Sequence, residues 1–210
     1  MSSLNTHSAD YSKVTVVVLA AGMSERMGDV NKLLIEVDGE VMIRRTVKLY
    51  LSLNLGKVLV VVGHQQAMIR SALSGLDVDF VDNPLFEQGQ LSSIRRGLRA
   101  LSECCELVLI ALADLPFLTA ADIERVLQSF DCSEGKTILV PYFKGQRGNP
   151  LLLKANQARE ADDQGVHLGC RKLIDKHPQK VQRLDVDNHH YTSDLDTPED
   201  VLRHLGIRLR

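Results

Sequence analysis

The sequence has no apolar run long enough to cross a membrane. A transmembrane helix needs ~20 apolar residues, whereas the longest apolar stretch near the start, Val14 to Ala21, has the length of a strand. The polar N-terminus, MSSLNTHSAD, also lacks the charged-then-apolar order of a signal peptide. These absences predict a cytoplasmic protein with no membrane partner.

Metal-binding cysteine pairs and an excess of basic residues are also missing. The four cysteines form no CxxC pair, and no histidine spacing indicates zinc, so we expect reduced, structural thiols. A net charge of −2 argues against a nucleic-acid partner. No repeat and no Pro/Gly/Ser-rich linker divides the 210 residues, a length that suits one α/β domain. We therefore predict a flexible tail over 1–12 and a single domain over 13–210.

Strand-like and helix-like segments alternate along the chain after this tail. Apolar β-branched runs predict buried strands, and apolar residues at helical spacing predict helices with one buried face. The predicted strands are 14–19, 57–62, 78–81, 107–112, 137–140 and 151–153, and the predicted helices are 41–53, 65–73, 91–101, 120–130 and one that begins at Pro198. This order predicts a Rossmann-like, mainly parallel twisted sheet with helices on both faces. Ligands of such sheets bind beyond the carboxyl ends of the strands.

Small residues and two cations follow the first predicted strand, in the segment LAAGMSERMGDVNK at 19–32. Residues with little side chain let a ligand approach the backbone, whose N–H groups can receive an anion or a base edge. Arg26 and Lys32 would neutralise a triphosphate and stabilise charge that develops at the reacting phosphorus. Neither GxxxxGK[ST] nor GxGxxG is present, so the segment is not a P-loop and not a dinucleotide fingerprint.

Acidic residues occur in two places that could form a metal site. Asp114 follows the predicted strand 107–112, and a carboxylate there would face the ligand crevice. Asp194 and Asp196, in SDLDTPED, are two residues apart and share one face of an extended segment, so either could complete the site with Asp114. Hard oxygen ligands of this kind suit Mg²⁺, which is the predicted cofactor.

These segments resemble a known family. LAAGxSxRMG followed by lysine resembles the signature of the nucleotidyltransferase superfamily, and the step from Arg26 to Lys32 is most similar to that of the molybdenum-cofactor nucleotidyltransferases. GQRGNP at 145–150 and DLDTPED near the end resemble the cytidylyltransferase branch. The guanylyl branch carries Gly-Gly where this chain has Ala20 and Ala21, which favours cytosine by analogy. The resemblance covers about residues 13–204 and implies the nucleotide-diphospho-sugar transferase fold.

The resemblance also implies a role for each part of the site. The implied catalytic residues are Arg26, Lys32 and Asp114, and the implied metal ligands are Asp114, Asp194 and Asp196. The implied nucleotide-binding residues are Leu19, Ala20, Ala21, Gly22, Arg26, Lys32, Gly63, Asp82, Gly89, Ser92 and Ser93. The implied acceptor-binding residues are Arg147, Gly148, Asn149 and Arg171.

The reaction expected from this resemblance moves CMP from CTP to the phosphate of molybdenum-molybdopterin and releases pyrophosphate. That phosphate is anionic at neutral pH, so its in-line attack needs no general base. CTP and the molybdopterin cofactor are the expected partners, and an apo-molybdoenzyme or its maturation chaperone would receive the product. Three alternatives stay open: a nucleotidyltransferase for another small phosphorylated acceptor, a nicotine-blue-type oxidoreductase of the same fold family, and a non-catalytic cofactor carrier.

Overall fold

The computed structural model describes residues 10–208 except 29, 132–134 and 164–173. Most of the predicted tail, and Arg171, therefore lie outside the described residues. Among the described residues, no helix combines the length and the apolar character that a membrane span requires.

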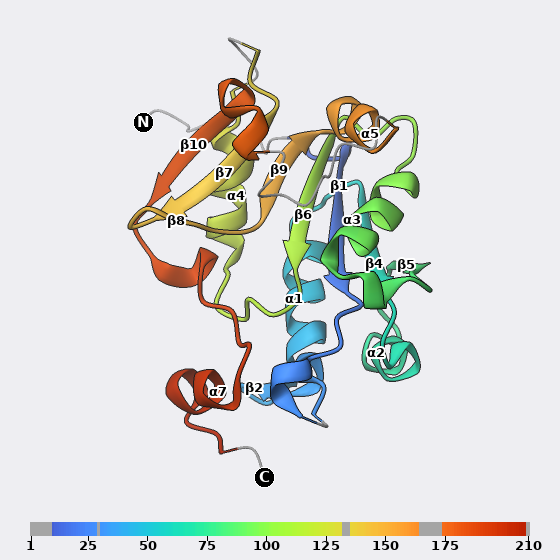
Figure 1. Ribbon diagram of the computed structural model, residues 1–210, viewed down its shortest axis with the longest axis vertical. Helices are drawn as coiled ribbons and strands as arrows, with labels where there is room; N and C mark the ends of the chain where they lie inside the picture. Colours follow the sequence, from blue (N-terminus) through green and yellow to red (C-terminus); the bar gives the residue numbers. More distant parts are fainter. Residues whose placement is uncertain (1–9, 29, 132–134, 164–173, 209–210) are drawn as a thin grey trace, which may run out of the picture.

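One eight-stranded sheet runs through the molecule in the order β10-β7-β9-β6-β1-β4-β5, with β8 paired to β7 (Figure 1). Its strands are β1 (Val14–Ala20), β4 (Lys57–Val62), β5 (Asp79–Asp82), β6 (Leu107–Leu112), β7 (Ile138–Phe143), β8 (Gln146–Arg147), β9 (Leu151–Lys154) and β10 (Val181–Val186). A separate hairpin consists of β2 (Glu36–Val37) and β3 (Glu40–Val41). The predicted strands are all present, whereas β8, β10 and the two short hairpin strands were not predicted.

The strand directions confirm the mainly parallel sheet. β1 lies parallel to both β4 and β6, β5 is parallel to β4, and β10 is parallel to β7. β9 lies between β6 and β7 and is antiparallel to both. The carboxyl ends of β1, β4, β6 and β7 therefore meet at one edge of the sheet.

Helices cover both faces of this sheet, as the sequence predicts. They are α1 (Met42–Leu51), α2 (Gln66–Ala72), α3 (Gln90–Arg99), α4 (Ala120–Ser129), α5 (Ala155–Asp163) and α7 (Pro198–Leu205). Buried side chains of α1, α2, α4 and α7 join one core cluster, and those of α3 and α5 join the other. β1 contributes alternate residues to the two clusters, Val16 and Val18 to the first and Val17 and Leu19 to the second. It is buried on both faces, as a central parallel strand should be.

Thr–Asp capping boxes begin α4 and α7. Thr119 and Asp122 exchange side-chain and backbone hydrogen bonds at the start of α4, and Thr197 and Asp200 do the same at the start of α7. Each box satisfies N–H groups that the first helical turn leaves without partners. Thr119 and Thr197 are therefore the N-caps of these two helices.

Gly97 lets α3 pack closely against β1. A Cβ atom at this position would lie 2.2 Å from Cγ1 of Val17 and 3.3 Å from Cγ2 of Val61. Gly97→Ala should therefore lower the free energy of unfolding by about 1–3 kcal/mol through overpacking, although alanine favours a helix by about 1 kcal/mol. Urea unfolding measures this, and a midpoint above that of the wild type would contradict the close packing.

Candidate active site

A cavity of about 520 Å³ opens at the carboxyl ends of β1 and β6. The loop after β1, the start of α3, the end of β6 with Asp114, and the segment between β10 and α7 all contribute to it. Its lining residues are Leu19, Ala21, Gly22, Met23, Ser24, Glu25, Arg26, Lys32, Leu33, Phe86, Gly89, Gln90, Ser93, Leu112, Asp114, Asp194 and Asp196. It combines small and apolar side chains with two cations and a cluster of carboxylates.

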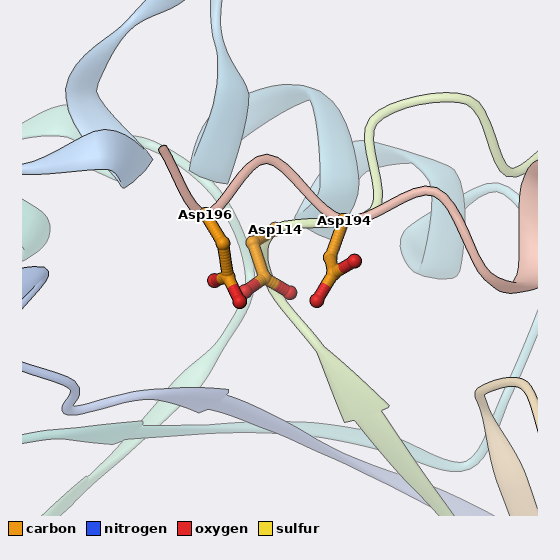
Figure 2. A group of neighbouring side chains, drawn as sticks. All are labelled: Asp114, Asp194 and Asp196. Carbon is orange, nitrogen blue, oxygen red and sulfur yellow. The ribbon is translucent and has the colours of Figure 1, made fainter. Parts of the chain in front are cut away.

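Three carboxylates from two distant parts of the chain meet in this cavity (Figure 2). Asp114 follows β6, and Asp194 and Asp196 come from the segment between β10 and α7. Each offers an oxygen atom within 4.8 Å of the others. Leu195, between the two acids, is fully buried, and its backbone N–H donates to the Asp114 carbonyl at 3.2 Å. This bond joins the two segments, and Asp194 and Asp196 share a face as their spacing predicts.

Lys32 and Arg26 reach the same carboxylates. The Lys32 ammonium donates to Oδ2 of Asp114 and to Oδ1 of Asp196, and Arg26 donates to Oδ2 of Asp196. Burial lowers the pKa of Lys32, but the charges and hydrogen bonds of Asp114 and Asp196 outweigh it and raise that pKa above its usual range. The lysine is therefore a permanent cation in the cavity at neutral pH.

The two acids of the SDLD segment differ in their electrostatic surroundings. Partial burial raises the pKa of Asp196, but hydrogen bonds and charge from Lys32 and Arg26 bring it below its usual value. Asp194 is exposed by surface area, yet its pKa is raised. The largest cause is loss of hydration among its neighbours, and the second is repulsion from Asp196 and Asp114. A further cation beside Asp194 would relieve this repulsion.

The donor set fits a divalent cation. Oδ1 of Asp114 is buried and has no hydrogen-bond partner in the described structure, which is costly for a carboxylate oxygen unless something else binds it. The three acids offer only hard oxygen atoms, which Mg²⁺ and similar ions prefer. Asp114 with Asp194 or Asp196 could therefore hold such an ion.

The cavity gathers most of the residues expected to bind the nucleotide. Seven of them line it, namely Leu19, Ala21, Gly22, Arg26, Lys32, Gly89 and Ser93. Ala20 points to the opposite side of β1 and packs in the other core cluster. Ser92 accepts a hydrogen bond from Asn83 and donates one to the Gly89 carbonyl. Asp82 ends the edge strand β5 and pairs with Arg70 at 2.7 Å, away from the cavity lining.

Gly63 acts through packing at the end of β4. A Cβ atom there would lie 2.6 Å from Cβ of Phe86 and 2.9 Å from Cβ of Ala21. Its lack of a side chain therefore lets these two cavity residues approach each other. Phe86 was not predicted as a site residue, although an aromatic residue inside the polar segment NPLFEQG was a signal that could have indicated it.

The expected acceptor residues lie at the end of β7, outside the lining of this cavity. Arg147 donates to the hydroxyl of Tyr142 at 3.1 Å and to Asp175 at 2.6 Å. Gly148 donates to the Pro141 carbonyl and Asn149 to the Tyr191 carbonyl, both at 2.8 Å. They lie at the same edge of the sheet as Asp114, because β6 and β7 run in the same direction.

Asp122, with histidine and asparagine partners, anchors the segment that leads to Asp194. Its buried carboxylate accepts a hydrogen bond from the side chain of Asn188 and contacts Nδ1 of His190, both at 2.8 Å. The hydroxyl of Tyr191 donates to the Asp122 carbonyl at 3.0 Å. Sequence reasoning assigned His190 no role, because its partner lies on α4, far away in the chain.

Comparison with known proteins identifies the family. Residues 16–181 match the MobA-like NTP transferase domain. The chain belongs to this family. The nucleotidyltransferase activity class and the nucleotide-diphospho-sugar transferase fold are thereby confirmed.

Individual relatives agree with this classification. A probable molybdenum cofactor guanylyltransferase of Natronomonas pharaonis is 25% identical over 202 residues, which cover 90% of this chain and 95% of that protein. The bifunctional protein GlmU of Cupriavidus necator is 30% identical over 115 residues, 54% of this chain and 25% of that protein. A solved nucleotidyl transferase from Methanothermobacter thermautotroptrophicus is 26% identical with a TM-score of 0.77, covering 90% of this chain and 94% of that one.

Proposed function

We propose that this protein transfers CMP from CTP to the phosphate of molybdenum-molybdopterin, giving molybdopterin cytosine dinucleotide and pyrophosphate. The observation that carries this proposal is the meeting of Lys32, Arg26 and three carboxylates in one cavity beside a loop of small residues. A polyphosphate needs both the cations and a bound metal. The similarity to a probable molybdenum cofactor guanylyltransferase over 90% of the chain supports the choice of acceptor.

Each group in the cavity has a role in this reaction. Asp114 with Asp194 or Asp196 would hold Mg²⁺, which supplies positive charge to the phosphates when it is bound. Arg26, with a side chain that is 66% exposed, would bind the outer phosphates. Lys32 is largely buried and would stabilise the charge that grows at the α-phosphate. The backbone at Gly22 would receive the nucleotide.

The transfer itself is a single substitution at phosphorus. An oxygen of the acceptor phosphate forms a bond to the α-phosphorus of CTP, and the bond from that phosphorus to the β-phosphate oxygen breaks. The acceptor oxygen is already anionic, so no proton has to be removed, and pyrophosphate carries away the released charge. Positioning and charge neutralisation therefore account for most of the catalysis.

The acceptor is assigned to the end of β7. Arg147 is only partly exposed and already oriented by Tyr142 and Asp175, and its guanidinium could exchange Asp175 for an acceptor phosphate. Gly148 and Asn149 belong to the same proposed acceptor site, and Arg171, which lies outside the described residues, is proposed from the resemblance alone. An apo-molybdoenzyme or its chaperone in the cytoplasm would take the product.

The test is to incubate the protein with Mg²⁺, one NTP at a time and either molybdenum cofactor or a sugar 1-phosphate, and to measure pyrophosphate. Release that needs CTP and the molybdenum cofactor is expected. Release that is faster with the sugar phosphate would favour the alternative nucleotidyltransferase. Binding of the cofactor without any pyrophosphate release would favour the carrier.

The base preference is predicted from Ala21, which is one of the residues that line the cavity. CTP should react faster than GTP, and Ala21→Gly should raise the GTP/CTP ratio of kcat/KM by about tenfold, the usual effect of one methyl group in a pocket. Ala20→Gly is the matched control, because Ala20 packs in the core on the other face of β1. Faster turnover of GTP by the wild type, or equal ratios in both variants, would contradict the prediction.

A further inference from the structure

Gln65, in the short connection between β4 and α2, has an unfavourable backbone conformation. Its φ of 49° and ψ of 35° place it in the left-handed region, where residues other than glycine and asparagine are uncommon. It precedes α2 as the N-cap residue, yet its side chain makes no capping hydrogen bond to that helix. Such strain persists where another interaction requires it, and here the side chain of Gln65 points elsewhere.

That side chain binds Asn31, the residue before Lys32. Oε1 of Gln65 accepts a hydrogen bond from Nδ2 of Asn31 at 3.1 Å. Asn31 is only 7% exposed, and its Oδ1 accepts from the backbone N–H of Leu33 at 3.1 Å. Because Leu33 fixes the oxygen of the Asn31 amide, the Nδ2 group must face Gln65 and requires an acceptor there.

Asn31 in turn determines the path of the backbone at Lys32. It is the N-cap of the short 3-10 turn Lys32–Leu34, and its side chain closes that turn. From the other side, the N–H of Lys32 donates to Oγ of Ser24 at 3.3 Å. A second cavity of about 490 Å³ borders this loop, and both Asn31 and Gln65 line it. The loop that leads to Lys32 is therefore not densely packed around Asn31. The hydrogen bond from Asn31 to Gln65 joins this loop to the start of α2.

We infer that Gln65 is a positioning residue for Lys32: its strained backbone holds the side-chain oxygen against Asn31, which sets the turn that aims the Lys32 ammonium at the reacting phosphate. This inference rests on the proposed function of Lys32. It assigns a role in the reaction to a residue that does not line the main cavity.

Gln65→Gly tests the inference, because it should separate stability from activity. Glycine adopts this φ without strain and is accepted as an N-cap. The relief of backbone strain should offset the lost hydrogen bond to Asn31, so the thermal midpoint should not fall. The loss of the acceptor for Asn31 should lower kcat by about tenfold, with a change in KM for CTP below about threefold. Gln65→Glu keeps an acceptor oxygen and should retain near wild-type kcat.

Asn54→Gly is the matched control. Asn54 also has a positive φ, 51°, but it is exposed and follows α1 near the other end of the sheet. This variant should leave both kcat and KM unchanged. If Asn54→Gly and Gln65→Gly lowered kcat equally, the effect would come from glycine flexibility and the inference would be wrong.

A double-mutant cycle and hydrogen exchange complete the test. In the Lys32→Ala background, Gln65→Gly should no longer lower kcat, whereas additive losses would overturn a role through Lys32. Without any substrate, the Leu33 amide should exchange faster in Gln65→Gly than in the wild type, and unchanged exchange would also overturn the inference. If the wild type releases no pyrophosphate, the proposed function fails, while the exchange rates still decide whether Gln65 holds this turn.

Discussion

Lys32→Ala is expected to lower kcat by about 10²-fold, which corresponds to about 3 kcal/mol of lost transition-state stabilisation. The Lys32 ammonium is largely buried between Asp114 and Asp196, which raise its pKa and keep it charged. If it acts on charge that grows at the α-phosphate, its contribution belongs mainly to the transition state. The affinity for CTP should therefore change much less than kcat. Calorimetry measures the affinity for CTP, and pyrophosphate release measures kcat. Both should be determined on the same protein preparations.

Arg26→Ala is the comparison for Lys32→Ala. Arg26 shares Asp196 with Lys32, but its side chain is far more exposed, 66% against 15%. We expect this variant mainly to raise KM for CTP, because an exposed cation contributes similar binding to the ground state and the transition state. If Lys32→Ala instead lost affinity while kcat at saturation stayed unchanged, Lys32 would be a binding cation only, and its catalytic assignment would be wrong.

Local sequence signals predicted the centre of the sheet and the core of the site. The β-branched run at 14–19 predicts a buried strand, and Asp114, which follows the strand 107–112, is expected at the ligand edge of a parallel sheet. The capping boxes of α4 and α7 are local in the same sense, since all their partners lie within four residues. Contacts of this range are encoded in short stretches of sequence.

Other features depend on contacts between residues that are distant in the sequence, or on side-chain directions that a sequence motif does not state. β10 (VQRLDV) mixes polar and apolar residues without a regular strand period, and its pairing with β7 at the edge of the sheet is a contact between distant parts of the chain. Asp122 contacts His190 across 68 positions of the chain, which no local pattern indicates. Ala20 and Ala21 belong to one motif, but alternation along β1 points them to opposite faces. That difference could have been predicted from the strand period alone.

Asp114→Asn is expected to abolish turnover while the fold stays intact. Asparagine has nearly the same shape, and the carbonyl of Asp114, which holds Leu195, is unchanged by the substitution. The variant loses the negative charge that pairs with Lys32. It can also place the amide nitrogen, which does not bind a cation, at the position of the buried Oδ1. Both losses act on the groups that neutralise the phosphates, so the residual rate should fall well below a tenth of the wild type. Pyrophosphate release and Mn²⁺ binding, followed by electron paramagnetic resonance, measure the two effects separately.

Asp79→Asn controls for the loss of a negative charge as such. Asp79 lies on β5 and pairs with Lys57, away from the cavity, so this variant should keep wild-type turnover and Mn²⁺ affinity. Thermal midpoints of both variants should stay close to that of the wild type, because an exposed ion pair contributes at most about 1 kcal/mol and the asparagine that replaces Asp114 fills the same volume. A folded Asp114→Asn protein that keeps more than about a tenth of the wild-type rate, a loss under ~1.4 kcal/mol, would show that Asp114 does not hold the metal. The proposed metal ligands would then be Asp194 and Asp196 alone.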